Sequence, residues 1–206
     1  MIEFEAHAIT KTFNRRSIFR DISVRVQSGE ILRVIGQNGA GKSTFVKILA
    51  QVLTPTSGEV RFSLEGHAVK RYLHNLIGFV SPYMQLYDEF TAEENLLLSL
   101  SMRARPDDMT AVKNLLGRVS LGGRGDDQVR TFSSGMKQRL KYAFALIHQP
   151  PILILDEPMS NLDTEGIATV RQVMEEQQKR GILVVATNDH TDLENFDHQV
   201  DLGGRS

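Results

Sequence analysis

Apolar and polar residues alternate along the first part of the chain. Residues 2–9 and 22–28 follow this pattern, which is typical of strands that bury one face. The turn-forming residues Asn14, Arg15 and Arg16 lie between the two segments. We therefore expect the chain to open with a pair of antiparallel strands.

Short apolar runs in the rest of the chain predict buried strands. A helical spacing of apolar residues from Lys42 to about Val52 follows the first run, and a second helical segment, 164–179, separates the last two. A strand, a helix and another strand in succession indicate a parallel sheet. The runs cover residues 31–35, 59–64, 77–81, 152–155 and 182–186.

The middle third of the chain has a different pattern. From Thr91 to about Leu146 the apolar spacing is helical and almost free of strand signals. No internal repeat, low-complexity tract or linker interrupts the sequence. We therefore predict an α/β fold with one domain over residues 1–206. A mostly parallel core sheet and an N-terminal antiparallel β subdomain would occupy about 1–84 and 147–206, and a helical subdomain about 85–146.

Composition narrows the classes of function only slightly. A net charge of −1 argues against a general polyanion binder, so we expect no nucleic acid partner. The absence of cysteine excludes disulfides, cysteine-ligated zinc and thiol catalysis. The apolar runs are far shorter than the ~20 residues of a membrane-spanning helix, and the first residues lack the features of a signal peptide. We expect a cytoplasmic protein.

A glycine-rich segment between the strand 31–35 and the following helix carries the clearest chemistry. It fits the pattern G-x-x-x-x-G-K-[ST], in which backbone N–H groups bind nucleotide phosphates. In this pattern Lys42 reaches the β- and γ-phosphates and the Ser43 hydroxyl binds Mg²⁺. The alternative is a strand-to-helix turn that binds nothing. The segment reads Gly36-Gln37-Asn38-Gly39-Ala40-Gly41-Lys42-Ser43-Thr44.

Two carboxylates follow the predicted buried strand 152–155. Open parallel sheets bind their ligands at this end of their strands, so Asp156 is expected to hold Mg²⁺ through its water shell. Glu157 is expected to orient or deprotonate the attacking water. The alternative is an acidic strand end that only caps the next helix.

These carboxylates begin a segment that resembles the Walker B and D-loop run of ABC ATPases. Another segment, upstream, occupies the place of the family's signature motif, and Phe13 resembles its adenine-stacking aromatic residue. The resemblance extends over essentially the whole chain and implies the ABC type of P-loop NTPase fold, with ATP and Mg²⁺ as ligands. The two segments read Asp156-Glu157-Pro158-Met159-Ser160-Asn161-Leu162-Asp163 and Phe132-Ser133-Ser134-Gly135-Met136-Lys137-Gln138-Arg139.

The signature segment also has a physical reading of its own. Ser133, Ser134 and Gly135 open a predicted helix, so a hydroxyl and free N–H groups lie at its positive end, which suits a phosphate. The alternative is a serine N-cap on an amphipathic helix. The resemblance implies a head-to-tail dimer with a second copy or a homologous ATPase. In it, each ATP lies between one P-loop and the other subunit's signature.

The chain departs from the family at the Q-loop, where Pro82 takes the place of the glutamine. In the family this glutamine approaches Mg²⁺ and water, and its loop links the site to the membrane partner. Proline has no side chain for either role. Gln85 is a candidate substitute, with a solvated loop glutamine as the alternative.

Further departures affect the switch histidine and the signature. Asn188 takes the histidine's position; it can donate a neutral amide hydrogen bond to the γ-phosphate but cannot become cationic. His190, two residues later, could turn inward or lie at the surface. Ser134 replaces a glycine and Met136 a glutamine. Arg33, in the strand before the P-loop, needs a partner if it is buried.

The resemblance implies the ATP-binding and ATP-hydrolysing subunit of an ABC transporter, located at the inner face of the cell membrane beside a separate membrane-spanning subunit. The chain is similar to the small single-domain ATPases of exporters, including the haem-exporter ATPase of cytochrome c maturation. A soluble ABC ATPase without a transport role is one alternative. A degenerate subunit that binds ATP with little hydrolysis, supported by Pro82 and Asn188, is another. No motif indicates the transported substrate or the direction of transport.

Overall fold

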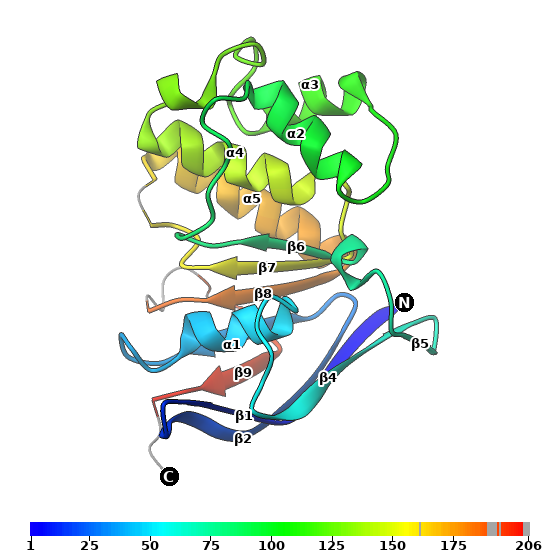
Figure 1. The fold of residues 1–206 in the computed structure, drawn as a ribbon, viewed down its shortest axis with the longest axis vertical. Coiled ribbons are helices and arrows are strands. Elements are labelled where there is room, and N and C mark those ends of the chain that lie inside the picture. Colours follow the sequence, from blue (N-terminus) through cyan, green and yellow to red (C-terminus); the bar gives the residue numbers. More distant parts are fainter. Residues whose placement is uncertain (161, 189–192, 194, 204–206) are drawn as a thin grey trace. The chain divides into compact units, whose positions relative to one another are not determined.

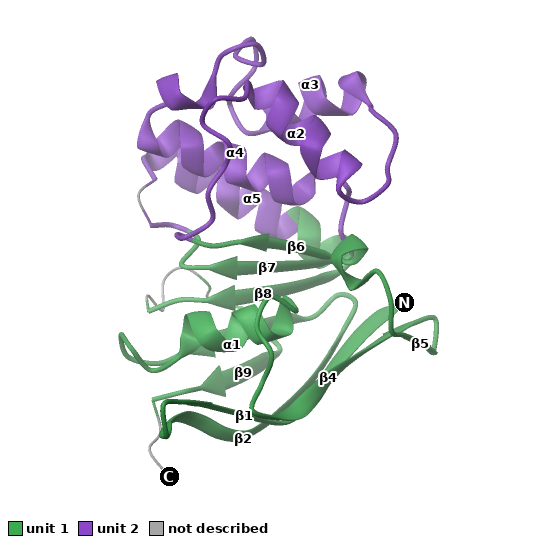
Figure 2. Cartoon of the chain, viewed as in Figure 1, with its two compact units in different colours: residues 1–81, 151–158, 176–206 green, residues 82–150, 159–175 purple. Residues whose placement is uncertain are grey.

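The computed structural model describes residues 1–160, 162–188, 193 and 195–203. The chain forms two compact units, which Figure 2 distinguishes by colour. Unit 1 contains residues 1–81, 151–158 and 176–206, and unit 2 contains residues 82–150 and 159–175. Both sheets belong to unit 1, and unit 2 is helical (Figure 1).

The first sheet of unit 1 is antiparallel, with the strand order β2-β1-β4-β5. The expected opening pair is confirmed, but its strands are longer than the alternating pattern indicated. Register shifts interrupt β1 after Ala6, and such bulges break the two-residue period from which strands are predicted. The strands are β1 (Ile2–Phe13), β2 (Arg16–Gln27), β4 (Ser57–Leu64) and β5 (His67–Val69).

The second sheet has the order β6-β7-β8-β3-β9, and every neighbouring pair is parallel. This confirms the prediction of a parallel core sheet. The short strand β9 was not predicted, because Val200 is its only buried residue and one apolar position gives no period. The strands are β6 (Ile77–Val80), β7 (Ile152–Asp156), β8 (Ile182–Ala186), β3 (Ile31–Ile35) and β9 (His198–Asp201).

Helix α1 (Lys42–Leu49) belongs to unit 1 and ends earlier than the predicted Val52. Gln51 has a φ of +61°, so the chain leaves the helical conformation there. Phe45 and Ile48 of α1 belong to one hydrophobic core that also takes in side chains from both sheets. This packing fixes the start of α1 against the end of β3.

Unit 2 is built from α2 (Ala92–Ser101), α3 (Met109–Arg118) and α4 (Ser134–Leu146), with a short 3₁₀ turn at Val129–Thr131. The three helices contact one another. Helix α5 (Thr164–Arg180) starts in unit 2 and ends in unit 1. The apolar side chains buried in unit 2 include Leu96, Leu100, Val112, Leu115, Leu116, Leu140 and Ala143.

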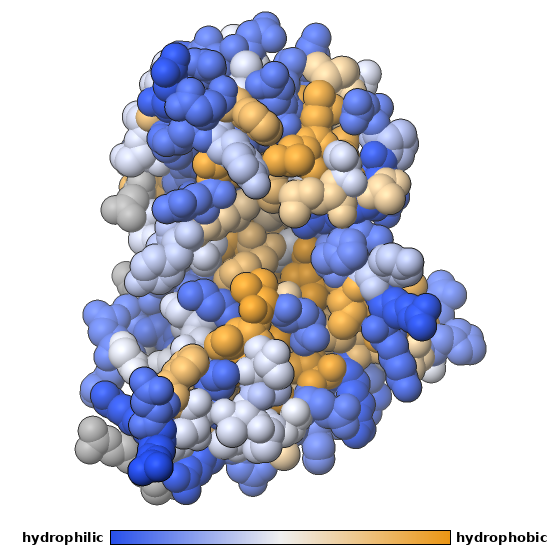
Figure 3. Space-filling view, viewed as in Figure 1, coloured by the Kyte–Doolittle hydropathy of each residue, from blue (hydrophilic) through white to orange (hydrophobic). Residues whose placement is uncertain are grey.

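Some large side chains of unit 2 stay at the surface, among them Tyr87, Phe90 and Met102. Figure 3 shows apolar side chains between hydrophilic ones on this unit. Among the described residues, no helix combines the length and the apolar character that a membrane span requires.

Candidate functional site

The carboxyl ends of β7, β8 and β3 lie side by side at one edge of the parallel sheet. Asp156 pairs in register with Ala186 of β8, and Ala186 pairs with Val34 of β3. The P-loop, residues 36–44, follows β3 directly. Neighbouring parallel strands therefore bring the P-loop, the two carboxylates and Asn188 to the same edge, where such sheets bind ligands.

The P-loop needs glycine at Gly41, the residue before α1. Its φ is +104°, and a Cβ atom there would lie 2.5 Å from Cγ2 of Ile18 in β2. The chain therefore makes a close approach to β2 before α1 begins. Gly41, the N-cap of α1, has no side chain that could cap the first N–H groups of the helix, so this helix end is suited to an anion.

Lys42 is buried, with a relative exposure of 6%. Its ammonium donates to the Gly36 carbonyl at 2.9 Å, to the Gln37 carbonyl at 3.4 Å and to Oδ1 of Asn188. The second group of Asn188, Nδ2, donates to Oδ1 of Asn38. Asn188 thus contacts the P-loop through both groups of its amide. His190 lies outside the described residues, as does Asn161 of the D-loop run.

Glu157 also faces the P-loop. Its Oε1 lies 3.6 Å from Nζ of Lys42, and its N–H donates to the Ala186 carbonyl at 2.8 Å. The φ of Glu157 is +50°, a left-handed conformation that is unusual for a residue with a long side chain. The turn after β7 therefore holds this carboxylate beside the lysine at some cost in backbone energy.

Asp156 has the character expected of a metal ligand. Its carboxylate is buried, with 1% exposure, and neither oxygen accepts a hydrogen bond from the residues that the structure describes. Burial raises the pKa of Asp156, while the Ser43 hydroxyl and the ammonium groups of Lys47 and Lys42 oppose that rise. A buried carboxylate whose burial these neighbours do not fully offset fits a divalent cation.

Mg²⁺ usually keeps several waters and binds one or two protein groups together with substrate phosphates. Ser43 and Asp156 would supply such a set. Within the described part of the chain, no group of three or more histidine, aspartate or glutamate side chains could hold a metal by itself. The residues present therefore fit a cation bound jointly by protein and nucleotide.

Phe13 ends β1 and is 44% exposed. The ammonium of Lys11 lies 4.7 Å from the centroid of its ring, which is within the range of a cation–π interaction. An exposed ring with one face covered can offer its other face to a base. Lys11 was not predicted as a site residue. It lies two residues before Phe13 in β1, and this spacing places the two side chains on the same side of the strand.

The signature residues open helix α4 in unit 2. Ser133 is the N-cap, and its hydroxyl accepts a hydrogen bond from the Met136 N–H at 3.2 Å. Ser134 and Gly135 form the first turn, with Ser134 exposed. Ser133 therefore caps the helix, as the N-cap alternative predicted. Its hydroxyl satisfies one N–H group of the first turn, that of Met136.

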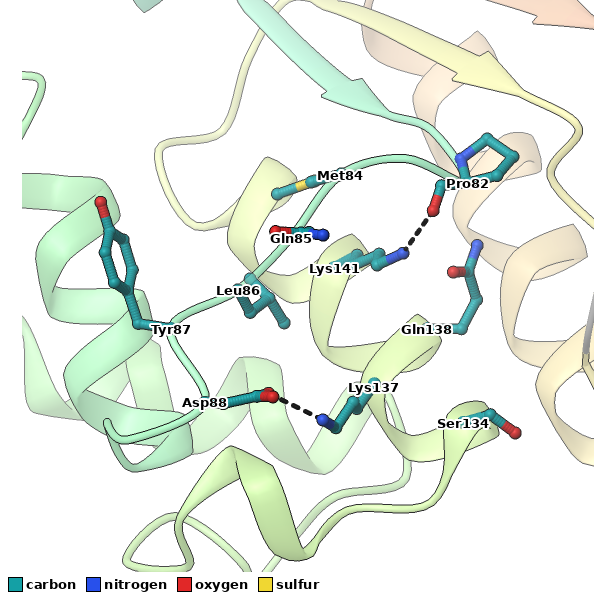
Figure 4. A pocket seen from close by; sticks show the side chains of 10 residues that line it. All are labelled: Pro82, Met84, Gln85, Leu86, Tyr87, Asp88, Ser134, Lys137, Gln138 and Lys141. Carbon is teal, nitrogen blue, oxygen red and sulfur yellow. Dashed lines mark hydrogen bonds and ion pairs between the residues drawn. The ribbon is translucent and has the colours of Figure 1, made fainter.

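A groove in unit 2 lies between α4 and the segment that contains Pro82 and Gln85 (Figure 4). Lys141 donates to the Pro82 carbonyl at 3.1 Å, and Lys137 forms an ion pair with Asp88 at 2.7 Å. Burial lowers the pKa of Lys141. The groove has a volume of about 640 Å³ and is lined by Pro82, Met84, Gln85, Leu86, Tyr87, Asp88, Ser134, Lys137, Gln138 and Lys141.

No pattern in the sequence predicted this groove. Lys137 and Lys141 lie one turn apart on α4, and this spacing could have indicated the groove. Gln138 is 6% exposed and its Nε2 has no hydrogen-bond partner within the part of the chain that the structure describes. A buried amide without an acceptor is an incomplete site.

The partner that Arg33 requires comes from a segment that the sequence did not assign. Its guanidinium donates to Oε1 of Gln199 at 2.6 and 3.2 Å and to the Leu193 carbonyl at 3.2 Å. It also lies 3.7 Å from the ring centroid of Phe196. Gln199 belongs to β9, so the partner could not be named before this strand was known to lie beside β3.

Comparison with known proteins gives a consistent result. A family model described as ABC transporter matches residues 19–160. The chain is 35% identical over 191 residues to the uncharacterized ABC transporter ATP-binding protein YcbN of Bacillus subtilis, covering 90% of this chain and 61% of that protein. It is 34% identical over 180 residues to the lantibiotic transport ATP-binding protein SrtF of Streptococcus pyogenes, covering 87% and 77%.

Solved structures agree with these relatives. An ATP-binding subunit of an ABC transporter is 27% identical, with a TM-score of 0.82, and the match covers 97% of this chain and 85% of that one. A dimeric ATP-binding cassette in a post-hydrolysis state with ADP and phosphate has a TM-score of 0.85 at 22% identity, covering 97% and 94%. At that identity the second likeness shows the fold alone.

Proposed function

We propose, from the premise that the chain belongs to the family of ABC transporter ATP-binding proteins, that it binds and hydrolyses ATP to power a separate membrane-spanning subunit. The observation that carries this proposal is the meeting of Lys42, Asp156 and Glu157 at the carboxyl edge of the parallel sheet. The chain spans 61% of the length of YcbN, so the activity of the whole protein is part of the proposal.

The P-loop would bind the nucleotide phosphates through its backbone N–H groups and Lys42. Phe13 would stack on the adenine. Ser43 and Asp156 would hold Mg²⁺, which neutralises phosphate charge when it is bound. Glu157 would orient the attacking water and accept its proton, because its carboxylate is held beside Lys42 by the strained turn after β7.

A second copy of the chain, or a homologous ATPase, would complete the site. Ser133, Ser134 and Gly135 would contribute the N-terminus of α4 to the phosphate of an ATP bound by the other subunit. ATP binding would thus close a head-to-tail dimer, and hydrolysis would release it.

The membrane-spanning partner would contact the groove of unit 2. The groove's Lys137 and Lys141 are donors, and so is Nε2 of Gln138, which has no hydrogen-bond partner among the described residues. These groups suit carboxylate or carbonyl oxygens of the membrane partner. The exposed aromatic ring of Tyr87 adds apolar surface at the groove. The subunit would then lie at the inner face of the cell membrane.

Hydrolysis is tested by phosphate release from the chain together with its membrane partner. We expect Mg²⁺-dependent turnover that falls by roughly 10²-fold or more in Glu157→Gln. Equal rates for the wild type and Glu157→Gln would refute an ATPase role. The partner is tested by purification from solubilised membranes, in which the absence of any co-purifying integral membrane protein would contradict the transporter assignment.

A further inference from the structure

We propose that Asn188 determines how strongly the site prefers ATP over ADP, because its side-chain amide competes with nucleotide phosphates for Lys42. We call the contacts of Lys42, Asn188 and Asn38 the amide bridge. The proposal rests on the proposed function, since it concerns the same nucleotide site.

The orientation of Asn188 in the amide bridge follows from its partners. Lys42 can only donate, so the group that faces it is Oδ1 of Asn188, and Nδ2 is left to donate to Asn38. An aspartate could accept from Lys42 but could not donate to Asn38. A cationic histidine could not accept from Lys42 at all. The bridge therefore uses both halves of an amide.

Asn188 is the acceptor that Lys42 can most readily exchange. Among the described residues, the other two hydrogen-bond acceptors of Lys42 are the carbonyls of Gly36 and Gln37, which belong to the backbone of the P-loop itself. Asn188 follows β8, is exposed and can turn away by rotation of its side chain. A phosphate oxygen that approaches Lys42 therefore replaces Oδ1 of Asn188.

The cost of this exchange differs between the two nucleotides. When Oδ1 leaves Lys42, ATP offers a γ-phosphate oxygen as a new acceptor for Nδ2 of Asn188. ADP takes the lysine but has no γ-phosphate for the amide. The amide bridge thus opposes both nucleotides, and only ATP compensates for its loss. The product would leave more readily than the substrate.

The experiment is equilibrium binding of fluorescent ADP and of a fluorescent non-hydrolysable ATP analogue to the full chain at constant Mg²⁺. In Asn188→Ala we expect ADP to bind about tenfold more tightly, since a hydrogen bond to a charged group no longer has to be exchanged. The affinity of the ATP analogue for Asn188→Ala should change less than that of ADP, or should decrease. The ratio of the two affinities should therefore fall by roughly tenfold.

Two further variants keep the test interpretable. Asn38→Ala removes one partner of the bridge and leaves Asn188 in place, so ADP binding should tighten by about two- to threefold. Asn114→Ala, an exposed asparagine of α3 in unit 2, is the matched control and should change neither affinity.

The outcomes separate this inference from the proposed function. A wild-type chain that binds neither nucleotide would overturn both. A wild-type chain that binds both, with an unchanged ratio of affinities in Asn188→Ala, would overturn the amide bridge alone. Weaker ADP binding in that variant would also overturn it.

Discussion

At the scale of one residue, Asp156 illustrates how a functional side chain can lower the stability of the folded chain. Its carboxylate is buried at the end of β7, and burial raises its pKa. The stability linked to this group is fully present below the pKa of the unfolded chain. It is lost as the pH rises through the raised pKa of the folded protein. Above this raised pKa the folded chain therefore holds an unfavourable charge unless a cation binds.

Asp156→Asn should stabilise the chain in Mg²⁺-free buffer by about 1 kcal/mol, because a neutral amide is less costly to bury than a carboxylate whose burial its neighbours only partly offset. For a chain of this length the unfolding midpoint would rise by roughly 2–4 °C. Differential scanning calorimetry in chelator measures this shift. Asp107→Asn, at an exposed loop position, is the control and should have no effect, whereas a lower midpoint for Asp156→Asn would contradict the argument.

At the scale of elements, α2 illustrates how local hydrogen bonds hold the groove segment in place. Its N-terminus is a capping box, in which Oγ1 of Thr91 accepts from the Glu94 N–H and the Glu94 carboxylate accepts from the Thr91 N–H. Asn95, in the same turn, is buried and bonds both the N–H and the carbonyl of Tyr87 at 3.0 Å. The start of α2 therefore fixes one end of the segment that lines the groove.

Thr91→Ala should lower the free energy of unfolding by about 1 kcal/mol, since it removes one of the two reciprocal bonds of the capping box. Urea unfolding followed by circular dichroism measures this loss. Thr110→Ala, at an exposed position within the first turn of α3, replaces the same side chain where it does not cap a helix. A loss no greater than that of Thr110→Ala would show that the box contributes little.

At the scale of the whole molecule, the site is expected to be complete only in a dimer. Glu157→Gln should retain ATP and remain dimeric, because the nucleotide is bound but the attacking water is not activated. Light scattering after size exclusion in Mg²⁺ and ATP should then give about twice the chain mass of 23.1 kDa.

The control for dimerisation changes the signature. Glu157→Gln combined with Ser134→Arg places a bulky cation at the exposed start of α4 and should keep the chain monomeric while ATP still binds. A monomer of the Glu157→Gln variant at every ATP concentration would argue against the head-to-tail arrangement.

The sequence by itself determined the features that depend on local pattern. The P-loop is one continuous segment, and so is the run of apolar residues before Asp156. The glycines of the first and the apolar residues of the second indicate the local backbone conformation directly. The parallel sheet followed from the succession of strand, helix and strand. The same reasoning could not detect β9, where a single buried valine gives no period, or the full length of β1, where bulges interrupt the alternation.

Only the tertiary structure decided which side chains meet. The partner of Arg33 lies 166 residues away on β9, and the amide bridge joins Asn188 to Lys42 and Asn38 across 146 and 150 residues. Such contacts depend on the order of strands in the sheet. The physical reason is that a hydrophobic period records which face of an element is buried, but not which neighbour buries it.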